Sequence, residues 1–211
     1  MKKIIKYLTL FLLTSCLTFA NVSYTIKDYD SISPLALKIA HTQLNVRETN
    51  GKNRSKQIDL YNKTAGVPLG SPYCAAGVYW CFKTASDSLK VKNILKQTGS
   101  ANGQFDYCRT KGVKDSVYNA GSGSLIVWKY NSSYNGHIEI VKRVLNSSNV
   151  ETIGFNTSSG TSGSQRDGEG VYIRQRNIRS KLGSMLVRGI INFDKKSNVY
   201  FCNHKCILYI Y

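Results

Sequence analysis

The apolar and polar positions divide the chain into a helical first part and a strand-rich second part. Ser33 and Pro34 form a typical helix start, and apolar residues then recur at helical spacing to about Arg47. A second, shorter helix is predicted around Ile58, and a third over residues 74–85, where small and aromatic residues follow one another as in a buried helix. A loop rich in glycine and proline separates these last two helices.

Beyond about residue 120 the character of the sequence changes to strands, and residues 137–145 show a clear apolar–polar alternation. Five strands are predicted, at residues 125–130, 137–145, 150–155, 170–176 and 185–193. A loop rich in glycine and serine, residues 158–170, joins the third strand to the fourth. Because helices come first and a run of strands second, the order predicts an α+β fold with N-terminal helices packed on a mostly antiparallel sheet.

The length of 211 residues suits one domain. We place this domain at residues 33–194, after a short leader at 21–32 and before a C-terminal tail at 195–211.

The first 20 residues have the pattern of a signal peptide, with three lysines ahead of a short apolar segment and a small-residue cleavage site after Ala20. A rival interpretation is a lipobox, residues 13–16, which would make Cys16 a lipid anchor. Both interpretations predict an exported protein, located in the periplasm or cell envelope or secreted. The apolar segment is too short to span a bilayer, so we expect no transmembrane span.

The chain is strongly basic, with a formal charge of +17. The lysines and arginines are spread along its length, and no nucleic-acid-binding motif is present, so we expect no nucleic-acid partner. A basic surface that serves solubility and an attraction to an anionic substrate remain equal alternatives. We expect a monomer.

Six cysteines bear on the chemistry, and five remain beyond Cys16. An odd number in an exported protein indicates a free thiol. Cys202 and Cys206 flank His204 in the tail, but a structural zinc ion requires four ligands, so we predict no metal and no cofactor.

Cys74 is the candidate nucleophile, because a thiol at a helix start has a lowered pKa. His137 opens a strand directly after a glycine turn, where an imidazole can act as the base. Asn156, at the end of the next strand, is the candidate orienter of that ring, and Glu139 is its rival, on the same strand face as His137.

The chain resembles the CHAP family of cysteine- and histidine-dependent amidohydrolases and peptidases of bacterial cell walls. The resemblance runs from about residue 36 to residue 176 and is strongest at residues 70–81, GSPYCAAGVYWC. Further similar segments follow in the family's order: ETNGKNR at 48–54, GHIEIV at 136–141, TIGFNT at 152–157 and GVYIR at 170–174. The resemblance implies a papain-like fold, hydrolysis of amide bonds in the peptide part of peptidoglycan, and Cys74, His137 and Asn156 as nucleophile, base and orienter.

Three positions depart from the family's pattern. Many members carry a glutamate two residues before the asparagine, where this chain has Gly154; serine replaces a common aspartate at Ser124, and tyrosine a common tryptophan at Tyr73. We therefore expect either an N-acetylmuramoyl-L-alanine amidase or peptidoglycan endopeptidase, or a weakened or inactive wall-binding protein on the same fold. The sequence leaves open which bond is cut and whether water or an amine accepts the acyl group.

Overall fold

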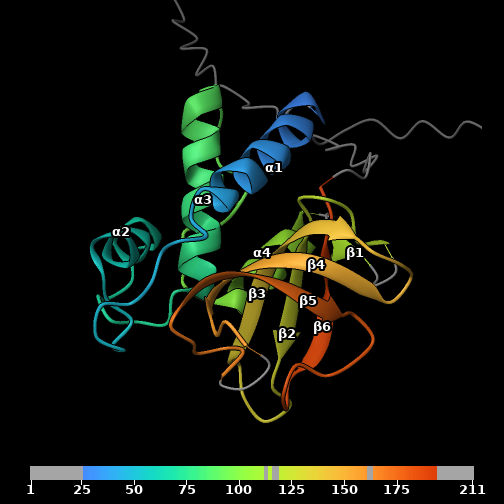
Figure 1. Cartoon of the computed structure of the whole chain (residues 1–211). Coiled ribbons are helices and arrows are strands. Elements are labelled where there is room, and N and C mark those ends of the chain that lie inside the picture. Colours follow the sequence, from blue (N-terminus) through green and yellow to red (C-terminus); the bar gives the residue numbers. More distant parts are fainter. Residues whose placement is uncertain (1–25, 112–113, 116–118, 161–163, 194–211) are drawn as a thin grey trace, which may run out of the picture.

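The structure is a computed structural model that describes residues 26–111, 114–115, 119–160 and 164–193 (Figure 1). Within these ranges helices precede the sheet; they are α1 (Ile26–His41), α2 (Lys56–Ala65), α3 (Cys74–Leu89) and α4 (Ala101–Thr110). The strands are β1 (Lys114–Asp115), β2 (Leu125–Lys129), β3 (Gly136–Val144), β4 (Asn149–Thr157), β5 (Gly170–Asn177) and β6 (Leu186–Ile191). The predicted α+β fold is confirmed.

The six described strands form one sheet in the order β1-β6-β2-β3-β4-β5, and every neighbouring pair is antiparallel. Figure 1 shows the sheet strongly curved, with α1, α2 and α3 to one side of it. The five predicted strands correspond to β2–β6, whereas β1 and α4 were not predicted. The strands β2, β3 and β4 follow one another as antiparallel hairpins.

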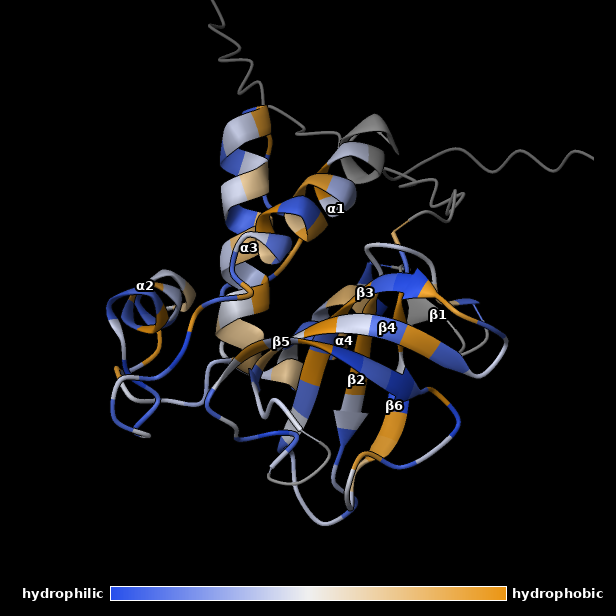
Figure 2. Cartoon of the chain, viewed as in Figure 1, coloured by the Kyte–Doolittle hydropathy of each residue, from blue (hydrophilic) through white to orange (hydrophobic). Residues whose placement is uncertain are grey.

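Each face of the sheet has its own apolar cluster. Leu125, Ile138 and Phe155 point to one face and pack with the helices in the larger cluster. Ile126 and Trp128 point to the other face and pack with residues of β6 and the segment before it. Figure 2 shows apolar residues along the strands and where α1 meets α3. His137 and Glu139 lie on the second face, because their cross-strand partners in β2 are Trp128 and Ile126.

The predicted start of the first helix is wrong. Helix α1 begins at Ile26, so Pro34 lies inside it, and the Ser33 hydroxyl donates to the carbonyl of Gly123 at 2.9 Å instead of capping a helix. Ile32 is fully buried in the core, which explains why the helix continues through the predicted leader. The helix also ends early, at His41, and the carbonyl of Val46 accepts a hydrogen bond from the backbone N–H of Val171 in β5.

Helices α2 and α3 confirm the predictions, and α3 approaches the sheet very closely. Ser55 caps α2 by accepting from the N–H of Ile58, and Gly66 ends it with a positive φ of 71°. A Cβ atom on Gly77 of α3 would lie 2.2 Å from the ring of Phe155 in β4, so only glycine permits this contact. None of the helices in the described ranges has the length and apolar character of a membrane span.

Candidate functional site

Cys74 is the first residue of α3 and lies at the edge of a groove, with 5% of its surface exposed. Tyr73 precedes it as the N-cap and makes no side-chain cap, so the N–H groups of the first helical turn remain available. Burial by itself would raise the pKa of the Cys74 thiol, but His137 and the N–H of Ala75 bring that pKa below its ordinary value. The imidazole of His137, together with the helix start, therefore favours a thiolate at this position.

His137 is fully buried on β3 and is held by one partner. Its Nε2 lies 3.0 Å from Oε1 of Glu139, whereas its Nδ1 has no hydrogen-bond partner in the described part of the chain. Burial would lower the pKa of His137, but Cys74 and Glu139 together raise it to about 9. Nδ1 is thus the nitrogen left free for chemistry beside Cys74, and a protonated ring balances the thiolate.

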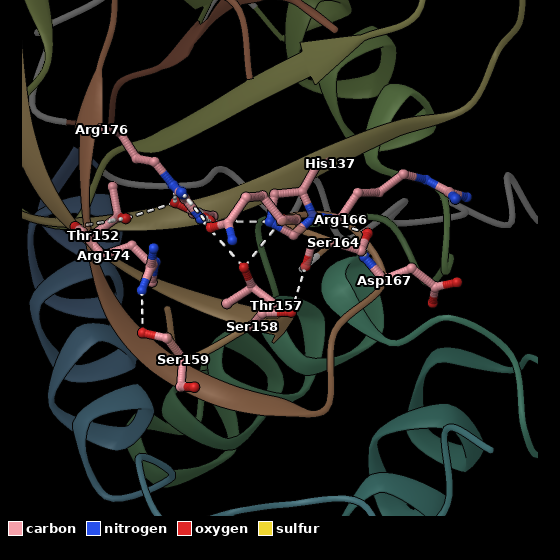
Figure 3. Close-up of polar contacts among 12 residues, drawn as sticks. His137, Thr152, Thr157, Ser158, Ser159, Ser164, Arg166, Asp167, Arg174 and Arg176 are labelled. Carbon is pink, nitrogen blue, oxygen red and sulfur yellow. Dashed lines mark hydrogen bonds and ion pairs between the residues drawn. The ribbon is translucent and has the colours of Figure 1, made fainter. Parts of the chain in front are cut away.

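Glu139 is fixed by a network of buried polar side chains, of which Figure 3 labels His137, Thr152 and Arg176. The guanidinium of Arg176 on β5 donates to both carboxylate oxygens, with Nε 2.9 Å from Oε2, and the Thr152 hydroxyl donates to Oε2 at 2.6 Å. Burial would raise the pKa of Glu139, but Arg176 and His137 hold it far below its usual range. The carboxylate is therefore ionised and pinned beside the imidazole.

Gly154 provides the room for this carboxylate. It is the cross-strand partner of Glu139, and a Cβ at this position would lie 2.6 Å from Oε1 of Glu139. Gly154, which departs from the family's pattern, thus lies directly beneath the side chain of Glu139. A carboxylate is present at this point of the sheet, and it is supplied by β3 in place of β4.

The side chain of Asn156 makes its hydrogen bonds with groups other than the ring of His137, so the predicted orienting hydrogen bond between these two residues is not found. Its Oδ1 accepts from the backbone N–H of Tyr73 at 2.7 Å, and its Nδ2 donates to the carbonyl of Gly168 at 3.0 Å. Its backbone is left-handed, with φ of 56°, at the irregularity where β4 and β5 change register. Asn156 therefore ties the start of the Cys74 helix to the loop before β5, and Glu139 takes the position beside the imidazole.

The other titratable residues singled out in the sequence lie elsewhere. Cys81 and Cys108 are free and buried; burial raises the pKa of both thiols, that of Cys108 to about 12. His41 is exposed at the end of α1. The signal peptide with Cys16 and the tail with Cys202, His204 and Cys206 lie outside the described residues. No group of three or more potential metal ligands occurs in the described ranges.

Two arginines of the site were not predicted. Arg176 binds Glu139 from β5, and Arg166 lines the groove beside Cys74. The sequence does not distinguish Arg176 from Arg174, which lies two residues earlier on the same strand; only the structure shows that Arg176 is the buried one. Arg166 lies in the loop between strands, and no pattern distinguishes it from other basic residues in the sequence.

Part of this chain is similar to a known protein family. Residues 66–156 match the family model of the CHAP domain, a stretch that begins before the Cys74 helix and ends at Asn156. None of the curated proteins matches the chain. The α+β fold, with helices packed on an antiparallel sheet, agrees with the papain-like fold of this family. The predicted resemblance to the CHAP family is therefore confirmed by this match over residues 66–156.

Proposed function

We propose that this protein is an exported cysteine hydrolase that cuts amide bonds in the peptide part of peptidoglycan. The CHAP domain supports amide-bond hydrolysis in the cell wall as the general activity. The observation that carries the specific proposal is that Cys74, His137 and Glu139 are all buried and that their pKa values are all shifted toward the charged forms, with His137 3.0 Å from Glu139. Such clustered shifts are typical of catalytic groups.

In the proposed reaction, the Cys74 thiolate attacks the amide carbonyl and forms a tetrahedral intermediate. The backbone N–H of Cys74, left open at the helix start, donates to the oxyanion. The His137 imidazolium gives its proton to the leaving amine through Nδ1, the C–N bond breaks and a thioester remains. The neutral ring then takes a proton from water, which attacks the thioester and releases the acid.

Glu139 is the residue that orients His137 in this proposal, in the role predicted for Asn156. It accepts the Nε2 proton, which fixes Nδ1 as the reactive nitrogen. Its position also speaks against the alternative of a weakened wall-binding protein, since that hypothesis rested on the missing carboxylate at Gly154. The glycine at position 154 therefore no longer supports the hypothesis of an inactive protein.

Isolated peptidoglycan sacculi and the purified protein test this proposal directly. We expect soluble peptide fragments, and mass spectrometry of the new amino and carboxyl ends identifies whether the sugar–peptide amide or a peptide bond is cut. Cys74→Ala should abolish release, whereas Cys108→Ala, a buried free cysteine away from the groove, should retain it. Release by Cys74→Ala at the wild-type rate would refute the proposal.

Export and localisation remain predictions from the first 20 residues, because these lie outside the described ranges. Mass measurement of the mature N-terminus distinguishes cleavage after Ala20 from a lipidated Cys16. The basic charge of the chain fits an anionic cell-wall substrate, in the same compartment that the signal peptide predicts.

A further inference from the structure

A groove of about 360 Å³ extends from Cys74 between segments that are distant in the sequence. Its walls are the start of α3, residues 98–101 before and at the start of α4, the turn at 134–136, and the loop that carries Arg166. Among the described residues that line the groove, Arg166 is the single charged one, and none is acidic. The groove is therefore a place where the substrate meets one positive charge without a protein counter-ion.

Arg166 forms no ion pair with a carboxylate of the described residues. Its guanidinium lies 6.0 Å from the centre of the Tyr130 ring, and Figure 3 shows its side chain diverging from that of its neighbour Asp167. Arg176 and Arg188, in contrast, are both paired with buried or half-buried carboxylates. An unpaired, half-buried guanidinium with five donors suits bidentate binding of a carboxylate.

Two helix N-termini add to this positive character. Helix α3 begins at Cys74 and helix α4 begins at Ala101, and both residues line the groove. Neither helix has an acidic residue in its first turn. Because the N-terminal turn of a helix carries partial positive charge, the groove favours an anion from two further directions.

The loop of Arg166 is held close to the reacting sulfur. Asn156 donates to the carbonyl of Gly168 in this loop and accepts from the N–H of Tyr73, the residue before the thiol. The charge of Arg166 is also near enough to contribute to the lowered pKa of Cys74. An anion on Arg166 would thus lie near the amide under attack.

We propose that Arg166 and this groove bind a free carboxylate of the substrate peptide, close to the amide that Cys74 attacks. The enzyme then selects stem peptides with free carboxylates over the same peptides with those carboxylates converted to amides. This inference rests on the proposed function and names the substrate class of the same site. The rival role for Arg166, stabilising the thiolate alone, predicts equal effects on both kinds of peptide.

The experiment compares one purified peptidoglycan fragment in two forms, with its free carboxylates intact and after their conversion to amides. We expect wild-type kcat/KM to be about tenfold higher for the acid form, as for a charge-assisted contact at a partly exposed site. Arg166→Gln should bring the ratio to within twofold of one, and Arg166→Lys should retain part of it. Arg179→Gln, which removes the same charge in the turn beyond the far end of β5, should leave the ratio unchanged.

Equal wild-type cleavage of both forms, or an equal loss on both in Arg166→Gln, would overturn the proposal. A binding measurement separates this result from failure of the hydrolytic function. In a Cys74→Ala background, calorimetric titration should show the acid form binding about tenfold more tightly, and additional Arg166→Gln should remove the difference. If neither form is hydrolysed, the hydrolytic proposal fails, and this affinity ratio alone decides whether the subsite exists.

Discussion

Replacing Glu139 by glutamine tests the carboxylate that β3 supplies beside His137. The amide keeps the shape of the side chain but removes the charge that stabilises the imidazolium. A hydrogen bond between charged groups contributes about 1.5–3 kcal/mol, which corresponds to about 10- to 150-fold in rate. We expect kcat/KM of Glu139→Gln to fall within that range, because the carboxylate is fully buried and its contact with the ring is 3.0 Å.

The assay is hydrolysis of a soluble peptidoglycan fragment between pH 5 and 10, alongside thermal unfolding. Without the carboxylate the pKa of His137 should fall below about 9, so the alkaline limb of the rate profile should shift to lower pH. Glu151→Gln is the matched control, since Glu151 lies on β4 and pairs with Lys142 and Arg143 away from the ring. A folded Glu139→Gln protein with wild-type kcat/KM and an unshifted profile would refute the reasoning.

Moving the carboxylate between strands provides a second, independent test. Gly154→Ala alone should reduce activity, because the new Cβ would lie 2.6 Å from Oε1 of a side chain locked by Arg176. Glu139→Ala should be nearly inactive. The double variant Glu139→Ala/Gly154→Glu should be at least tenfold more active than Glu139→Ala, because the two positions compete for one space. Equal activity of the single and double variants would show that position 154 cannot serve the ring.

Three further outcomes are expected. A thiol-reactive probe at pH 6–7 should label Cys74 at least 100-fold faster than Cys108, because the pKa of Cys74 is lowered and that of Cys108 is about 12; equal labelling would contradict an activated thiol. Asn156→Ala should lower both the melting temperature and kcat, with His137 pKa unchanged by NMR titration. Gly77→Ala should lower the free energy of unfolding by about 1–3 kcal/mol in chemical denaturation, and an unchanged midpoint would refute the tight contact with Phe155.

The nucleophile and the base could be predicted because their signals are local. Cys74 follows a glycine–proline loop at a helix start, and His137 opens a strand after a turn. The residue that orients His137 could not be decided from the sequence, because Glu139 and Asn156 are both spaced so that they could reach the ring. The choice depends on the register that pairs Glu139 with Gly154 and on the left-handed backbone of Asn156, and neither is encoded in a short stretch of sequence.

The errors among the helices have a similar cause. Helix α4 contains asparagine, glycine and glutamine at positions 102–104, which gives a weak helical pattern; it is supported by the Ser100 cap and by burial of Phe105 and Cys108. Helix α1 extends through Pro34 because its earlier turn buries Ile32. In both cases tertiary packing overrides local preference, whereas the strands could be predicted from their short apolar or alternating segments.

The charges of Cys74, His137, Glu139 and Arg176 alternate in sign along this buried row of side chains. They sum to zero when the thiol is a thiolate and the ring is protonated. Acylation converts the thiolate to a neutral thioester, so these four buried side chains would carry one excess positive charge if the ring kept its proton. Arg176 cannot release a proton, and the imidazolium can. Transfer of the imidazolium proton to the departing amine is therefore favoured at the step that forms the thioester, because it returns the total charge of the four side chains to zero.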